Sequence, residues 1–79
     1  MKLVLICDEE KIFEGRVSKV EIETENGGVT ILPGHQPYMT KIIGRVSYTE
    51  PGSASKVVGI DEGFVYTDGE VCFVVVDKK

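Results

Sequence analysis

Hydrophobic and polar side chains alternate with a period of two along much of this chain, which is the pattern of β-strands that bury one face. The alternation is most regular over 19–24, where Val20 and Ile22 lie on one face and two glutamates on the other. The one candidate helix, 8–11, is too short to form alone and is predicted to be a loop. The pattern therefore predicts an all-β chain.

Further strands are expected at short intervals along the chain. They cover 1–7, 19–24, 45–48, 56–60, 63–66 and 71–77, with a loop over 50–55. Strands about eight to twelve residues apart, with turn residues between them, are typical of a β-sandwich or a barrel. The predicted fold is a single two-layer β-sandwich or flattened barrel over residues 1–79.

A first hairpin is predicted at Asn26-Gly27, because this pair favours the type I′ turn with positive φ at both positions. One face of this hairpin is apolar and the other is rich in glutamate. The acidic face is interpreted either as solvated or as a surface that meets basic loops of a partner. The expected cross-strand pairs are Ile22–Ile31 and Thr24–Val29.

A second hairpin is predicted at Asp68-Gly69 by the same argument. Both of its faces are apolar, so each needs to be covered. One face is expected in the core, and the other is expected either inside the molecule or against another protein. The expected pairs are Tyr66–Val71, Phe64–Phe73 and Val65–Cys72.

The segment 31–40 lies between strand-like runs and is predicted to form a corner. Pro33 and Pro37 fix their own φ, and Gly34 permits a backbone conformation that most side chains disfavour. For the only histidine, His35, three roles stay open: ring-to-backbone hydrogen bonds that hold the corner, contact with a partner, or metal binding. Tyr38 and Met39 are expected in the core or in an interface.

Four features in order resemble the N-terminal β-sandwich domain of the epsilon subunit of F-type rotary ATP synthases. Pro33-Gly34-His35-Gln36-Pro37 is similar to the proline-glycine-histidine-x-proline signature of that family. The other three are Phe13-Glu14-Gly15-Arg16-Val17, the turn Glu25-Asn26-Gly27-Gly28, and the closing hairpin of 63–66 and 71–77.

The chain departs from the family pattern at several positions. Gly28 occupies a position that is acidic in many members, Thr30 replaces a glycine, and the link after the corner is shortened to Ile43-Gly44. The usual glycine pair before the closing hairpin is Glu62-Gly63. The sequence ends after a strand, whereas most members continue into two helices that carry inhibition and, in some, ATP binding; neither property is expected of this chain.

The resemblance implies a β-sandwich of about ten short strands that is a non-catalytic rotor subunit of the central stalk. It implies binding to the gamma subunit and to the c ring, so that ion-driven rotation is coupled to ATP synthesis. It also implies a peripheral location on the cytoplasmic face of the membrane, in a bacterial complex. The implied contact residues are Glu25, Asn26, Gly27 and Gly28 for the c ring, and His35, Tyr38 and Thr40 for gamma.

Composition and charge narrow the classes of protein to which this chain can belong. The hydrophobic fraction of 42% fits a soluble globular domain, and no apolar run approaches the roughly 20 residues of a membrane span. The apolar start, 1–7, lacks a cleavage site and is predicted to be a strand rather than a signal peptide. A net charge of −4, with basic residues scattered singly, argues against a nucleic-acid surface.

Few residues of the chain are suited to catalysis or to binding a cofactor or a metal ion. No catalytic residues, cofactor or metal site are predicted, because the single histidine has no recognisable orienting partner and no glycine-rich loop leads into a helix. Cys7 and Cys72 lie in apolar contexts and are expected to be buried, reduced thiols. The pair Asp61-Glu62 is expected in a solvated turn.

Two other functions remain open. A small β-domain can bind a carbohydrate or a peptide as a free-standing module. A divergent paralogue can also keep the fold outside the synthase.

Overall fold

The computed structural model describes residues 1–78, which form seven β-strands and no helix. The strands are β1 (Lys2–Cys7), β2 (Glu10–Arg16), β3 (Lys19–Thr24), β4 (Gly27–Ile31), β5 (Tyr38–Thr49), β6 (Lys56–Thr67) and β7 (Val71–Asp77). They join in the order β2-β1-β7-β6-β5-β3-β4, with β1 parallel to β7 and the other neighbours antiparallel. Within 1–78 there is no helix of the length and apolarity needed to cross a membrane.

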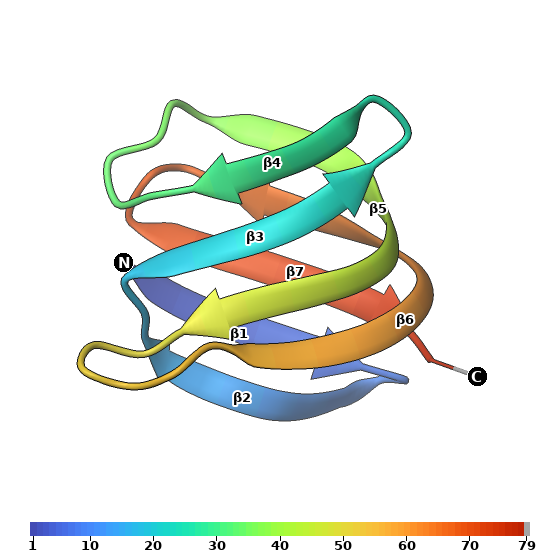
Figure 1. Ribbon diagram of the computed structural model, residues 1–79, viewed down its shortest axis with the longest axis horizontal. Coiled ribbons are helices and arrows are strands. Elements are labelled where there is room, and N and C mark those ends of the chain that lie inside the picture. The colour runs from blue at the N-terminus through green and yellow to red at the C-terminus, as the bar shows by residue number, and fades with distance from the viewer. Residues whose placement is uncertain (79) are drawn as a thin grey trace.

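The sheet is folded into two layers because β5 and β6 run through both (Figure 1). The first half of β5 and the second half of β6 lie beside β7, β1 and β2. The second half of β5 pairs with β3 and with the first half of β6, and β4 completes that layer. The predicted all-β sandwich is confirmed. Seven strands suffice, rather than about ten, because two long ones each serve both layers.

A β-bulge lies where the two long strands bend. Ile60 and Asp61 of β6 lie opposite the single residue Gly44 of β5, whose φ is 79°. Because of the extra residue, even-numbered residues of β6 such as Ile60 face the core before the bulge, and odd-numbered residues such as Val65 face it after the bulge. The bulge therefore keeps the apolar side of β6 toward the core in both layers.

The predicted turn at Asp61-Glu62 is wrong, because both residues belong to β6. Their predicted solvation is right: both side chains are exposed. They are exposed together, although they are neighbours in a strand, because Asp61 is the extra residue of the bulge.

The core lies between the layers and draws on both. Phe13 of β2 reaches Tyr48 of β5 across the core, with ring centroids 4.6 Å apart. Cys7 and Cys72 are free and buried, as predicted, and burial raises the pKa of Cys72 to about 12. The fully buried side chains include Leu3, Leu5, Val17, Val20, Ile31, Ile42, Val46, Val65, Val74 and Val76.

The two predicted hairpins form, but each register differs from the predicted one by two residues. Ile22 pairs with Val29 in β3–β4, and Tyr66 pairs with Phe73 in β6–β7. The expected pairs Ile22–Ile31, Thr24–Val29, Tyr66–Val71, Phe64–Phe73 and Val65–Cys72 are therefore wrong. A shift of two residues leaves each side chain on its predicted face, so the predicted faces are right.

Side-chain hydrogen bonds hold the loops of both hairpins. Thr24 Oγ1 accepts the N–H of Asn26 at 3.1 Å and donates to the carbonyl of Gly27 at 2.8 Å. Gly27 has positive φ but Asn26 does not, so the predicted type I′ turn at Asn26-Gly27 is absent. Asp68 Oδ1 accepts the N–H groups of Glu70 and Val71 in the second hairpin. The first loop is therefore Glu25-Asn26, one position earlier than predicted, and the second covers 68–71, two residues longer than predicted.

A two-residue turn with positive φ at both positions occurs instead between β1 and β2. Asp8 has φ of 50° and Glu9 of 71°, and they join the paired residues Cys7 and Glu10. This is the backbone requirement of a type I′ turn, met without glycine. Of the predicted loop 8–11, only Asp8 and Glu9 are outside strands.

Candidate partner-binding surfaces

One layer presents an apolar surface to the outside, here called the apolar face. It covers the first half of β5, the second half of β6, β7 and β1. Its cross-strand rows run Met39–Tyr66–Phe73–Val4 and Lys41–Phe64–Val75–Ile6, so Lys41 is a charged residue at its β5 edge. Its most exposed members are Met39 (70%), Phe64 (60%), Val75 (48%), Tyr66 (46%) and Phe73 (43%), and Val4 and Ile6 are half-buried.

The apolar face is large for the exposed surface of a monomeric protein. Three aromatic side chains of roughly 200 Å² each, about half exposed, contribute on the order of 300 Å² before the aliphatic residues are added. Monomeric proteins rarely expose contiguous apolar patches larger than a few hundred Å². Of the two alternatives for the second apolar side of the closing hairpin, internal burial is therefore excluded: that side faces outward.

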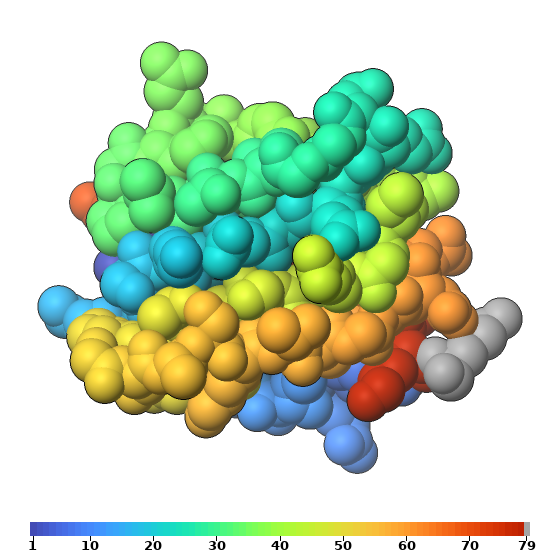
Figure 2. Space-filling model, in the orientation of Figure 1, coloured from blue at the N-terminus to red at the C-terminus, as the bar shows by residue number. Residues whose placement is uncertain are grey.

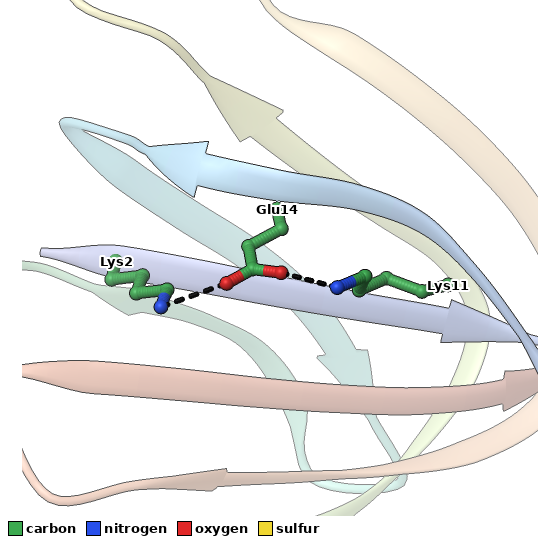
Figure 3. A network of polar contacts seen from close by, with 3 residues as sticks. All are labelled: Lys2, Lys11 and Glu14. Atoms are coloured by element: carbon green, nitrogen blue, oxygen red, sulfur yellow. Dashed lines mark hydrogen bonds and ion pairs between the residues drawn. The ribbon is translucent and has the colours of Figure 1, made fainter.

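A charged network borders the apolar face along β2 (Figure 3). Glu14 lies opposite Val4, and Lys11 opposite Ile6. One carboxylate oxygen of Glu14 is 2.8 Å from Lys2 Nζ, and the other binds Lys11 Nζ. Hydrogen bonds from Lys11 and Lys2 lower the pKa of Glu14 to about 2. The carboxylate thus stays charged through the physiological range.

The corner between β4 and β5 is held by a turn and by the β6–β7 loop. The carbonyl of Leu32 accepts the N–H of His35 at 3.0 Å, across Pro33 and Gly34, whose φ is 83°. This is a type II turn, which needs positive φ at its third residue. Gly34 N–H donates to the carbonyl of Gly69, where a Cβ would lie 2.6 Å from the carbonyl oxygen of His35. The corner therefore rests directly on Gly69.

The corner brings two of its predicted contact residues together. His35 Nδ1 lies 2.7 Å from the carbonyl oxygen of Gln36, and its ring centroid is 5.5 Å from that of Tyr38. The predicted ring-to-backbone hydrogen bond is confirmed. Thr40 lies two residues beyond Tyr38 on the same side of β5, and all three side chains are partly exposed.

Tyr38 and Met39 take different environments on the two sides of β5. Tyr38 packs against the core, whereas Met39 belongs to the apolar face. Among residues 1–78, no three His, Cys, Asp or Glu side chains are grouped as a metal ion would require.

The predicted ring-facing turn, 25–28, is exposed at one tip of the β3–β4 hairpin. A Cβ at Gly28 would meet only the carbonyl oxygen of Ile22, at 3.8 Å, so a side chain fits there. Glu25 is the only residue of the turn with an ionisable side chain.

A shallow hollow of about 670 Å³ adjoins this turn on the outer side of the second layer (Figure 2). Its lining includes Glu21, Glu23, Thr30, Arg45 and Val57. Arg45 Nε is 2.6 Å from Glu23 Oε1, so the two side chains neutralise each other. The hollow thus offers a mixed polar surface without a positioned acid, base or nucleophile.

Sequence reasoning missed the contribution of β1 to the apolar face. Val4 and Ile6 alternate with the buried Leu3 and Leu5, so β1 is apolar on both sides. The same two-sided pattern drew attention to the closing hairpin and would have extended the face to β1.

The whole length of the chain, residues 1–79, matches the family model of the ATP synthase delta/epsilon chain, β-sandwich domain. An ATP synthase epsilon chain of Ureaplasma parvum serovar 3 is 33% identical over 69 residues, which are 85% of this chain and 51% of that protein. Another, of Janthinobacterium sp. (strain Marseille), is 34% identical over 73 residues, which are 90% of this chain and 47% of that protein. The chain thus spans about half the length of the curated relatives it matches.

Two solved structures of mitochondrial ATP synthases contain chains with the same fold. A chain of the Euglena gracilis OSCP/F1/c-ring structure has a TM-score of 0.86 at 23% identity, over 94% of this chain and 48% of that one. A chain of the Tetrahymena thermophila central stalk/c-ring structure has a TM-score of 0.78 at 16% identity, over 99% of this chain and 63% of that one. At these identities the likeness concerns the fold. The full-length match to the family model, with the corner and the sandwich that carry it, places this chain in the family of ATP synthase delta/epsilon chain β-sandwich domains.

Proposed function

We propose that this chain is a non-catalytic subunit of the central stalk of an F-type ATP synthase, which joins the gamma subunit to the c ring. It turns with the rotor, so that ion-driven rotation of the ring reaches the catalytic subunits and is coupled to ATP synthesis. The observation that carries the proposal is the large apolar face on a domain whose family and relatives belong to ATP synthases.

The gamma subunit is the proposed partner of the apolar face and of the adjoining corner. Burial of the exposed aromatic side chains supplies the affinity, since aromatic anchors dominate protein interfaces. His35, Tyr38 and Thr40 lie at the end of β5 nearest the corner, next to Met39 of the apolar face. Tyr38 and Thr40 lie on the core side of β5 and Met39 on its outer side, so gamma contacts both sets around the first half of β5, which within residues 1–78 pairs with β6 alone.

The c ring is the proposed partner of the turn Glu25-Asn26-Gly27-Gly28. This turn lies at the tip of a hairpin in the second layer, so the two partners meet different parts of the sandwich. Because Gly28 has no side chain, Glu25 and the backbone groups of the turn make the contacts. The chain associates with the membrane through the complex, on the cytoplasmic face in a bacterium.

A β-sandwich suits this mechanical role. Its strands are tied by continuous ladders, and β5 and β6 link the layers without a break in the chain. Torque that enters through the apolar face is therefore transmitted through paired backbone rather than through loops.

The gamma contact is tested by substituting Phe64→Asp, with Val57→Asp as the matched control. Phe64 is 60% exposed on the apolar face, and Val57 is 61% exposed on the other layer. We expect both variants to fold, and Phe64→Asp to weaken binding to the cognate gamma subunit at least tenfold, or about 1.4 kcal/mol. Co-purification with gamma measures this; equal loss in both variants, or in neither, contradicts the proposal.

The ring contact is tested by Glu25→Lys, with Glu21→Lys as the control for charge. Both glutamates lie in or next to β3, but Glu21 is away from the tip of the hairpin. We expect Glu25→Lys to lower ATP synthesis driven by an ion gradient in reconstituted vesicles, with unchanged unfolding. If coupling is the same in both variants, Glu25 does not meet the ring.

A further inference from the structure

We propose that basic side chains of the gamma subunit meet an acidic end of the apolar face, made by Asp8, Glu62 and Asp77, and so fix gamma in one orientation. This inference rests on the proposed role in the central stalk and specifies the chemistry of the partner's surface. Apolar burial has no direction, whereas charge complementarity selects orientation and accelerates association.

The three carboxylates continue the rows of the apolar face. Glu62 lies two residues before Phe64, and Asp77 two residues after Val75, so both share the outer side of the layer. Glu62 and Asp77 are directly paired across β6 and β7. Asp8 follows β1, and its N–H donates to the carbonyl of Val76 at 3.1 Å, which keeps it beside β7. All three residues are exposed.

Among residues 1–78, acidic groups outnumber the neighbouring cations at this end, which are Lys41 and Lys78. Lys41 Nζ is 3.7 Å from Glu62 Oε2, and both side chains are more than half exposed, so this ion pair is weak. The backbone N–H of Lys78 donates to Asp8 Oδ1 at 3.0 Å. The further acids at this end, from the β1–β2 turn and the bulge, are Glu9, Glu10 and Asp61.

The pairing of Glu62 with Asp77 is unfavourable in the free chain. Like charges directly opposite each other on a sheet are destabilising, and Glu62 and Asp77 are direct cross-strand partners. A basic side chain of a partner relieves this repulsion, so the cost in the free chain becomes a gain on binding. This property distinguishes the acidic end from an ordinary solvated surface.

The charges also argue against a second copy of this chain as the occupant. If two apolar faces stack with strands in the same direction, the acidic ends coincide. If the strands run in opposite directions, Glu62 of one copy meets the end of β6 in the other, where Asp68 is exposed. Both arrangements bring acids together, whereas a partner with a basic border avoids this.

The Asp77→Lys variant separates a binding role from a structural one. The substitution replaces a repulsive cross-strand pair by an attractive one, so the midpoint of unfolding is expected to stay or rise. The rate of association with the cognate gamma subunit is expected to fall about fivefold, and its salt dependence to flatten. Glu21→Lys makes the same change in charge on the other layer and is expected to associate within about twofold of the wild type.

Stopped-flow association at about 50 mM and 500 mM salt measures these rates. Equal rates for Asp77→Lys and Glu21→Lys, or a wild-type rate that salt does not lower, would overturn the basic border on gamma while leaving gamma binding intact. No binding by the wild-type chain would overturn the proposed function, and this inference with it.

Discussion

Glu14 is the acidic residue whose pKa the fold lowers most. Hydrogen bonds from Lys11 and Lys2 lower the pKa of its carboxyl group to about 2, from about 4.3 in an unfolded chain. A depressed pKa stabilises the folded state at pH values above the unfolded pKa. This stabilisation is lost as the pH falls through the folded pKa.

Substitution of Glu14→Gln is therefore expected to destabilise the domain slightly at pH 7 and to have less effect as the pH approaches 2. The effect is small because the three side chains are exposed to solvent and their attraction is screened. Urea unfolding of both proteins across this pH range measures it. A difference in midpoint that is as large at pH 2 as at pH 7 would show that Glu14 acts through packing instead.

Within β6, a single extra residue decides which side of the strand faces the core. Deletion of Asp61 is expected to remove the bulge opposite Gly44 and to turn Phe64 and Tyr66 inward while Val65 turns outward. Misplacement of a whole half-strand costs more than about 5 kcal/mol, which exceeds the margin of many small domains.

We expect the deletion variant to be unfolded by circular dichroism and Asp61→Ala to fold as the wild type, since its side chain is exposed. A deletion variant with native spectra and an unchanged unfolding midpoint would contradict the role given to the bulge.

Strands and their faces could be predicted from sequence because alternation records burial directly. The hairpin registers could not, because side chains of the loops set them. Thr24 and Asp68 hydrogen-bond to backbone groups within their own turns, and such bonds leave no periodic trace. Each error was two residues, which preserves the faces, so the apolar sides of both hairpins were still assigned correctly.

The layer arrangement was harder to predict because it depends on two long strands and one bulge. The sequence shows Lys56 to Ile60 and Gly63 to Tyr66 as separate strands, since the alternation changes phase between them. In the structure this phase change is the bulge of β6, and the strand continues through it.

Across the whole molecule, the candidate contact surfaces divide into those the sequence located and those it did not. The corner and the turn 25–28, the proposed contact with the c ring, could be located in the sequence by their proline and glycine residues. The extent of the apolar face could not be predicted without the order of the strands. Val4 and Tyr66 share a cross-strand row only because β7 pairs with both β1 and β6.

The central claim is that this domain binds the gamma subunit. Calorimetric titration of the chain into the cognate gamma subunit tests it most directly. We predict a dissociation constant of about 1 μM or tighter, equivalent to at least about 8 kcal/mol, with a negative heat-capacity change from burial of the apolar face. Absence of detectable heat and of any complex at concentrations of about 100 μM, or about 5 kcal/mol, would contradict the account.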